Sequence, residues 1–384
     1  MTERLYYTDS HMRDFGARVL ECSKLDKGWS VILDRTAFFP EGGGQLADTG
    51  IIGSVRVRDV QMLEGRILHY TDGPLPAGER VICRIDWQQR FRRMQSHSGE
   101  HIVSGLVHRL FGYENVGFHM GESITIDFDG ELSWEQLMQV ETLANEAVCK
   151  NLPIRCFFPG EQELKSLEYR SKLELTEDVR LVEIEDIDLC ACCAPHVSST
   201  GEIGLIKIQD SMRHRGGVRI SLVCGEDALE DYRRKQDSAA AISAALSVKR
   251  DAIAPAVSKL LDEQQRQKER IAQVSLALAA MKAQAVEKTE GNICVFDDVL
   301  DEVATRELVN LLVEKCGGIA AVFHGSDAEG YRYVMGSKTI DLRAASRQIN
   351  AGIMGKGGGS REMIQGRAEE KAERIASFVD SLAL

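Results

Sequence analysis

The sequence predicts a multidomain α+β protein with a small N-terminal β-barrel, an α+β domain, a helical linker and a C-terminal α/β domain that carries a glycine-rich loop. Three observations support this prediction. Short strand-like segments separated by Gly and Pro fill residues 1–88, mixed helical and strand periodicities follow over 89–225, and an Ala-rich helical stretch at 226–288 precedes a new mixed pattern at 289–384. The 384-residue chain is long enough to bury more than one core.

Charge and composition narrow the classes of function. A net charge of −12 argues against a protein that coats nucleic acid with its whole surface, because phosphate binding needs Lys and Arg. No apolar run reaches the roughly 18–20 residues that span a bilayer, and the first residues lack the build of a signal peptide. We therefore predict a cytoplasmic protein with no membrane partner. The ten scattered cysteines favour free thiols plus a metal ligand over a disulfide framework.

The barrel prediction comes from the first 88 residues. Their apolar segments are short, and Pro and Gly interrupt them at intervals typical of a small antiparallel barrel. We expect these strands at 16–22, 29–33, 51–61, 66–70 and 79–85.

A run of three glycines lies inside the barrel region. Gly42, Gly43 and Gly44 let the backbone take positive φ or pass close to a ligand, and Glu41 and Gln45 place polar groups on either side. We interpret 41–44 as a substrate-binding segment. A flexible hairpin loop is an equally simple interpretation of the same composition.

The next domain begins with a helix that carries two histidines. Apolar residues recur at helical spacing through 94–111, so His97 and His101 should project from one helix face. About a hundred residues later, Cys192 and His196 offer a thiolate and a further imidazole. Three nitrogens and one sulfur form the kind of shell that Zn²⁺ prefers, so we predict one zinc ion per chain.

Other interpretations of these motifs remain open. A His pair at this spacing is common on exposed helices, and clustered cysteines are often buried small side chains. The string His97 to His101 also reads H-x-x-E-H, the signature of inverzincin proteases, in which Glu100 would be the general base. The Cys192 to His196 segment argues against the protease, which would not need it.

Basic residues could supply the nucleic-acid contacts that the net charge does not. Arg90, Arg92 and Arg93 precede the histidines, and Arg213 and Arg215 form a second basic turn. A solvated helix face is the alternative for the first group. Strands are expected at 123–128, with Thr125 and Asp127 on one face, and also at 154–158, 179–184, 205–209 and 218–223, with a helix at 134–151.

The last two segments are a helical linker and a new domain. After Pro255, apolar residues from Val257 to Ala285 recur in steps of three and four, which indicates a coiled-coil-like seam and either a hairpin or a homodimer contact. The C-terminal domain should contain strands at 293–296, 319–324 and 331–335, and helices at 301–315, 342–353 and 368–382. Its glycine-rich loop with adjacent cations suits a phosphate backbone and consists of Lys356, Gly357, Gly358, Gly359 and Arg361.

Taken together, these motifs resemble one family. The segments 39–45 and 200–204, the His97/His101 pair and the Cys192/His196 pair match, in order and spacing, the editing half of alanyl-tRNA synthetase and the long form of its free-standing relatives, the AlaX-type alanyl-tRNA editing proteins. The C-terminal glycine run resembles the DHH-associated domain of the synthetase, so the resemblance covers essentially the whole chain. Two departures are the Cys193-Ala194-Pro195 segment between the second pair of ligands and the stretch 116–120, which stands where relatives carry the polar residue that discriminates serine.

The resemblance implies a zinc-dependent hydrolase that removes serine, and also glycine, from mischarged tRNA(Ala). It places the zinc ligands at His97, His101, Cys192 and His196, and it implies no aminoacylation domain. Such a hydrolase is needed because a pocket built for a methyl group rejects an added hydroxyl by only about a hundredfold. The candidates for handling water and ester, in falling order, are Glu100, Gln45 and His119, and Thr125 joins the substrate-binding candidates.

The role of the metal and two rival functions stay open. Four protein ligands are typical of a structural zinc site, so we expect one ligand to be loosely held or the metal to position the substrate. The rival functions are a zinc-stabilised RNA-binding module without catalysis and the inverzincin-like metalloprotease.

Overall fold

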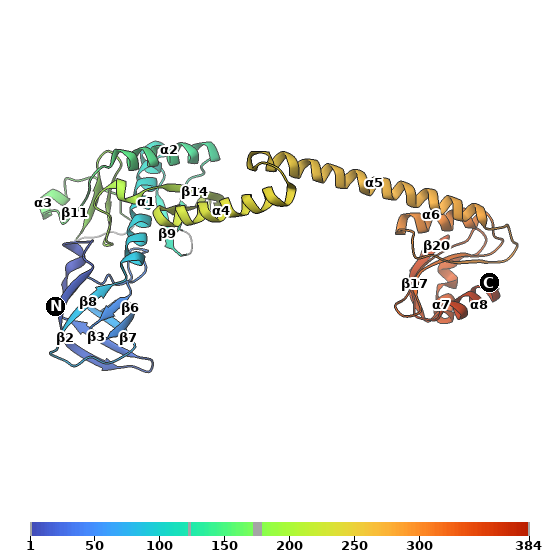
Figure 1. Ribbon diagram of the computed structural model, residues 1–384, viewed down its shortest axis with the longest axis horizontal. Helices are drawn as coiled ribbons and strands as arrows, with labels where there is room; N and C mark the ends of the chain where they lie inside the picture. Colours follow the sequence, from blue (N-terminus) through green and yellow to red (C-terminus); the bar gives the residue numbers. More distant parts are fainter. Residues whose placement is uncertain (1, 122–123, 172–178, 383–384) are drawn as a thin grey trace. The chain divides into compact units, whose positions relative to one another are not determined.

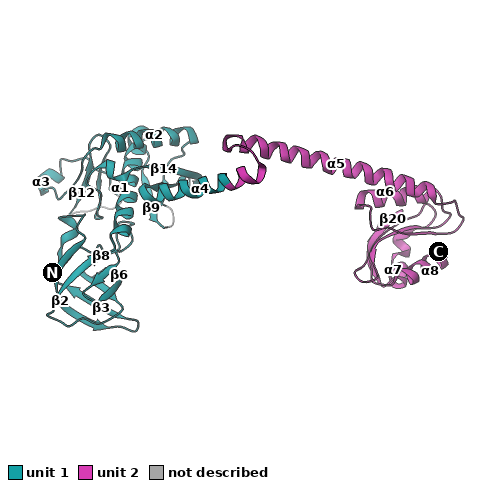
Figure 2. Cartoon of the chain, viewed as in Figure 1, with its two compact units in different colours: residues 1–240 teal, residues 241–384 magenta. Residues whose placement is uncertain are grey.

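The computed structural model describes residues 2–121, 124–171 and 179–382, and it confirms the α+β class. The chain forms two compact units, Met1–Ala240 and Ala241–Leu384 (Figure 2). Ser123, where a strand was predicted to begin, lies outside the described residues.

Six N-terminal strands close into a barrel in the order β2-β3-β7-β6-β5-β8 (Figure 1). Alternate side chains point inward, and Val19, Val31 and Val57 are fully buried in the barrel core. The segment predicted as one strand at 51–61 is two strands, because Gly53 takes a positive φ of 58° and turns the chain. The bounds are β2 Asp14–Lys24, β3 Trp29–Leu33, β5 Gly50–Ile52, β6 Val55–Leu63, β7 Arg66–Thr71 and β8 Arg80–Ile85. The short segments β1 (Glu3–Arg4) and β4 (Arg35–Thr36) pair in parallel beside it.

Helix α1 (Trp87–Phe111) leaves the barrel and runs through the centre of the first unit. It begins at Asp86, whose side chain accepts a hydrogen bond from the Gln89 amide, and ends at Gly112 with a φ of 72°. The helix is two turns longer than the 94–111 predicted, so the three arginines ahead of the histidines lie on it. Every residue of α1 from Met94 to Val107 is buried, which makes α1 the core helix of this unit.

Helix α2 (Trp134–Lys150) begins at a capping box on Ser133 and packs with α1 in the same hydrophobic core.

Two sheets surround α1. The first sheet has the order β14-β15-β10-β9 and the second the order β11-β12-β13. Their bounds are β9 Asn115–Met120, β10 Ile124–Phe128, β11 Ile154–Phe157, β12 Leu181–Ile184, β13 Asp188–Ala191, β14 Ile206–His214 and β15 Gly217–Cys224. Short helical turns lie at α3 (Glu161–Leu164) and η2 (Thr200–Ile203).

The predicted helical linker consists of α4 (Gly225–Leu246) and α5 (Ile253–Ala285). The sequence predicts one interruption at Pro255, but the break lies at 247–249, where Ser247 takes a φ of 53°. Pro255 is the third residue of α5, where its missing N–H has no helical acceptor to lose. Only Ala279 and Ala283 of α5 are buried, so most of the predicted seam is exposed.

The second unit is built on a five-stranded sheet of order β16-β17-β18-β20-β19. Helix α6 and the end of α5 cover one face, and α7 and α8 cover the other. The bounds are β16 Ile293–Phe296, α6 Glu302–Val313, β17 Ala320–Ser326, β18 Gly330–Gly336, α7 Leu342–Gly352, β19 Gly355–Gly359, β20 Met363–Ala368 and α8 Ala372–Ser381.

The predicted glycine-rich loop is wrong in form, because Gly355–Gly359 is the edge strand β19. Glycine is rare inside strands, so the composition of this run predicts a loop. Here a Cβ at Gly357 would lie 2.3 Å from the Tyr333 hydroxyl and one at Gly359 would lie 2.3 Å from the Met363 carbonyl. Close approach to residues of β18 and β20 therefore explains Gly357 and Gly359. None of the described helices is both long and apolar enough to cross a membrane.

Candidate metal centre

Four side chains from two distant segments meet inside the first unit. One nitrogen each of His97, His101 and His196 and the Sγ atom of Cys192 all lie within 4.8 Å of one another. The first two histidines lie one turn apart on α1, and Cys192 directly follows β13. The structure therefore brings together the four residues that the sequence singled out as metal ligands.

Each imidazole of this cluster is held through its Nδ1 atom by a different partner. The Nδ1 distances are 3.0 Å from His97 to Gln45 Oε1, 2.8 Å from His101 to Asp188 Oδ2 and 3.0 Å from His196 to Ser98 Oγ. The Nε2 atoms of His97 and His196 face inward, 3.6 Å and 3.4 Å from Cys192 Sγ. Such outer partners fix ring orientation and tautomer, so the rings are arranged for coordination through Nε2.

The surroundings of the cluster favour a bound cation. Burial, and next the neighbouring Cys193, raises the pKa of the Cys192 thiol well above its usual value, whereas burial, and next His101 and His97, lowers the pKa of His196 well below its usual value. A cation would stabilise the thiolate and bind the neutral imidazoles. Three imidazole nitrogens and one thiolate sulfur fit Zn²⁺.

A cavity of about 580 Å³ opens onto the cluster. His97, His101 and Cys192 lie in its wall together with Glu100. Glu100 is 4% exposed, and its Oε1 accepts hydrogen bonds from Ser104 Oγ at 2.7 Å and from the Asn115 amide. Its Oε2 lies 3.9 Å from His101 Nε2. The carboxylate is thus fixed at the metal cluster, inside a cavity that could admit a substrate.

The glycine run forms a tight turn at the rim of this cavity. Gly42 and Gln45 exchange backbone hydrogen bonds of 3.1 and 3.0 Å across Gly43 and Gly44, whose φ values are 58° and 82°. A Cβ at Gly44 would lie 2.5 Å from the ring of Phe118. Both conditions require glycine, and the turn directs the fully buried Gln45 toward His97.

Several predicted site residues lie elsewhere. Glu41 is exposed and accepts a hydrogen bond of 3.0 Å from Gln61, and Gly42 does not belong to the cavity wall, unlike Gly43 and Gly44. His119 is exposed and pairs across the strands with Thr125. Strand alternation explains this, because Phe118 faces His97, with ring centroids 4.9 Å apart, and its neighbour must face away.

The three arginines expected to form a basic patch ahead of the histidines are instead held by contacts within the protein. Arg90 is fully buried, where it pairs with Asp48 and donates to the carbonyl oxygens of Ala37 and Ser10. The prediction of tRNA contact for Arg90 is therefore wrong. Charge density in sequence could not reveal the partner, because Asp48 lies 42 residues earlier.

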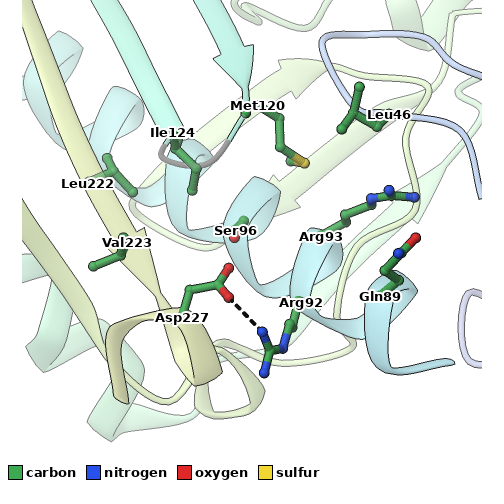
Figure 3. A pocket seen from close by; sticks show the side chains of 11 residues that line it. Leu46, Gln89, Arg92, Arg93, Ser96, Met120, Ile124, Leu222, Val223 and Asp227 are labelled. Carbon is green, nitrogen blue, oxygen red and sulfur yellow. Dashed lines mark hydrogen bonds and ion pairs between the residues drawn. The ribbon is translucent and has the colours of Figure 1, made fainter. Parts of the chain in front are cut away.

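Arg92 and Arg93 border a small pocket of about 190 Å³ beside α1 (Figure 3). Arg92 pairs with Glu226, Asp227 and Glu230 of α4, so three carboxylates offset its charge. Arg93 donates to the Ala47 carbonyl oxygen. These contacts connect α1 to α4 and to the barrel.

The remaining predicted cations are exposed. Arg213 and Arg215 lie at the β14–β15 hairpin, where Arg213 is 3.5 Å from Glu131. Lys356 and Arg361 lie in the second unit, and Arg361 is 4.0 Å from Asp341.

Asp188 and Arg170 are site residues that the sequence did not reveal. Arg170 donates two hydrogen bonds to Asp188, of 2.8 and 2.9 Å, while Asp188 holds His101. Asp188, Cys190 and Cys192 follow one another at a spacing of two residues, which is the period of a β-strand. This spacing is the signal in the sequence that could have identified Asp188 as a site residue. His101, Asp188 and Cys190 form a second compact ligand group next to the first.

Comparison with known proteins gives the family context. The family described as "Threonyl and Alanyl tRNA synthetase second additional domain" matches residues 179–221, and "tRNA synthetases class II (A)" matches residues 3–89. The chain is 28% identical to the alanyl-tRNA editing protein AlaX-L of Pyrococcus horikoshii, over 98% of this chain and 96% of that protein. The resemblance to long-form alanyl-tRNA editing proteins is confirmed.

Alanine–tRNA ligases are also similar to this chain. Those of Ignicoccus hospitalis and Methanopyrus kandleri are each 30% identical to it, over 98% and 100% of this chain but only 42% and 45% of the ligases. The chain thus spans less than half of these ligases. The AlaX-L relative, in contrast, matches it nearly from end to end.

Proposed function

We propose that this protein is a zinc-dependent hydrolase that removes serine, and also glycine, from mischarged tRNA(Ala). The observation that supports it most is a metal-ligand cluster in the wall of a cavity with a fixed carboxylate beside it. The relative from Pyrococcus horikoshii supports the substrate class, because it is an alanyl-tRNA editing protein.

His97, His101, Cys192 and His196 would hold the zinc ion. When bound, zinc can polarise the ester carbonyl or lower the pKa of a water molecule. Glu100 would accept a proton from an attacking water through Oε2, because Oε1 is already held by Ser104 and Asn115. Gln45 acts through His97, whose Nδ1 it holds, and therefore positions a ligand instead of contacting the ester.

The partner would be tRNA(Ala). The exposed cations Arg213, Arg215, Lys356 and Arg361 are candidates for contacts with its phosphates, and Gly358, with open space around its Cβ position, allows close approach to β19. We also propose that the chain self-associates as a homodimer through the exposed apolar residues of α5. Leu260, Leu261, Ile271, Val274 and Met281 are each more than half exposed.

A deacylation assay with Ser-, Gly- and Ala-tRNA(Ala) tests the function. We expect hydrolysis of Ser-tRNA(Ala) with Ala-tRNA(Ala) spared, because a site that hydrogen-bonds the seryl hydroxyl loses that bond with alanine. Equal rates on the seryl and alanyl esters would exclude an editing role. RNA binding without hydrolysis would identify a zinc-stabilised RNA-binding module, and peptide cleavage that survives Cys192→Ala would identify the metalloprotease.

A further inference from the structure

A basic row crosses the sheet of the second unit. The strand registers pair His324 of β17 with Arg332 of β18, Arg332 with Arg367 of β20, and Arg367 with Lys356 of edge strand β19. Residues directly opposite one another on neighbouring strands share a face. The four side chains therefore form one continuous row, although 43 positions separate His324 from Arg367 in the sequence.

The row lies on the part of this face that α6 leaves open. Val322 and Val334, two residues from His324 and Arg332 along their strands, pack in the core under α6. Alternation places His324 and Arg332 on the same face, beyond the start of the helix. A cavity of about 710 Å³ lies there, bordered by the first turn of α6 and by His324, Arg332 and Arg367.

The negative charge beside the row comes from Asp301 and Glu302, which border the same cavity. Within the described part of the chain, neither Lys356 nor Arg367 forms an ion pair. Arg332 lies 3.4 Å from Glu302, but both side chains are more than 60% exposed, so that pair is weak. His324 is held through Nδ1, 3.1 Å from the Asp297 carbonyl oxygen, which leaves its Nε2 for a ligand.

We propose that the row His324–Arg332–Arg367–Lys356 binds the phosphate backbone of an RNA strand. Neighbouring strands lie about 4.8 Å apart, so the row extends over about 14 Å. Cations in a line on an open face fit a linear polyanion better than a compact anion, which needs converging donors. Because the whole chain is acidic, such a local row is also what RNA capture requires.

This inference rests on the proposed function for its choice of RNA, and one comparison tests it. In the full-length protein, Arg332→Glu with Arg367→Glu is compared with Arg343→Glu with Arg347→Glu. The control pair makes the same change in charge on α7, which covers the opposite face of the sheet, and both control side chains are exposed. Binding of uncharged tRNA is measured by fluorescence anisotropy over a range of salt concentrations.

We expect the row variant to bind at least about tenfold more weakly and the slope of log K against log salt to fall by about two, while the control keeps the wild-type values. The milder Arg332→Gln with Arg367→Gln, and thermal melts of all variants, separate lost contacts from lost folding. Unchanged affinity and slope would overturn the inference. Equal competition by millimolar inorganic phosphate and by RNA would also overturn it, in favour of a small-anion site.

Hydrolysis of Ser-tRNA(Ala) at saturating concentration separates this inference from the proposed function. We expect the row variant to keep wild-type hydrolysis, because the row lies outside the metal centre. A wild-type protein that binds tRNA through the row but does not hydrolyse the ester would contradict the proposed function alone.

Discussion

The residue that holds the Nδ1 atom of each ligand histidine decides how firmly that ring is oriented in the metal centre. Asp188 is buried and links His101 to Arg170, so a charged network holds this ring. Outer partners of metal ligands typically change affinity by about 10–100-fold. Asp188→Asn should therefore bind zinc about tenfold or more weakly in competition with a chelator, while Asp237→Asn, an exposed position on α4, should bind as the wild type does.

The identity of the sulfur ligand gives a second prediction. Cys192→Ala should lose the metal, because among the described residues Cys192 Sγ is the sulfur that lies within the cluster of three histidines. Cys190→Ala and Cys193→Ala should keep about one zinc per chain when metal content is measured. Full metal content in Cys192→Ala would assign the sulfur ligand to a neighbouring thiol, Cys190 or Cys193. Loss of the metal from Cys190→Ala would assign it to Cys190.

A buried histidine in the barrel makes stability depend on pH. His69 is fully buried, with Nδ1 3.0 Å from the Val31 carbonyl oxygen and Nε2 2.8 Å from Thr36 Oγ1, and burial lowers its pKa from 6.5 to about 4. The unfolded chain takes up the proton first. Stability is therefore lost as pH falls from about 6.5 to about 4, by about 3 kcal/mol at most.

Denaturant unfolding at a series of pH values checks this. His69→Gln cannot titrate, so its free energy of unfolding should vary less across this window than that of the wild type. An equal loss in both proteins would assign the pH dependence to other groups.

At the scale of elements, the glycine turn offers a prediction with two separable causes. Gly44→Ala would place a side chain at a positive φ and also bring its Cβ against Phe118. Gly216→Ala would place a side chain at a φ of 86°, but the space around its Cβ position is open. We expect Gly44→Ala to cost about 1–3 kcal/mol more stability and to weaken zinc binding through the displaced Gln45. Thermal melts and metal content of both variants measure this. Equal effects would mean that Phe118 simply moves aside.

Elements with a regular apolar periodicity could be predicted from the sequence. Features decided by backbone packing or by the tertiary fold could not. Trp29–Leu33 and Ile293–Phe296 occur as strands within the expected bounds, since buried side chains decide them. Gly355–Gly359 was missed because backbone packing decides it. The metal ligands were predictable because two of them share a helix face, but the pairing of Arg90 with Asp48 depends on the tertiary fold.

For the whole molecule, the division into units gives the fifth prediction. A protein that consists of residues 1–240 retains the metal centre and also Glu226, Asp227 and Glu230, the partners of Arg92. We expect it to bind zinc and hydrolyse Ser-tRNA(Ala), to bind tRNA more weakly and to lose self-association. Sedimentation and anisotropy beside the full chain measure this. Equal tRNA affinity and salt slope would assign the second unit to a structural or partner-binding task.

The exposed length of α5 has a consequence for local stability. Helices of this kind are marginal in water without packing, and before Ala279 no residue of α5 is buried. Its amide protons should therefore exchange with solvent long before those of the barrel or of α1, and proteases should cut there first. Slow exchange in this helix would show that another surface covers it in solution, and its concentration dependence would show whether that surface belongs to a second copy of the chain.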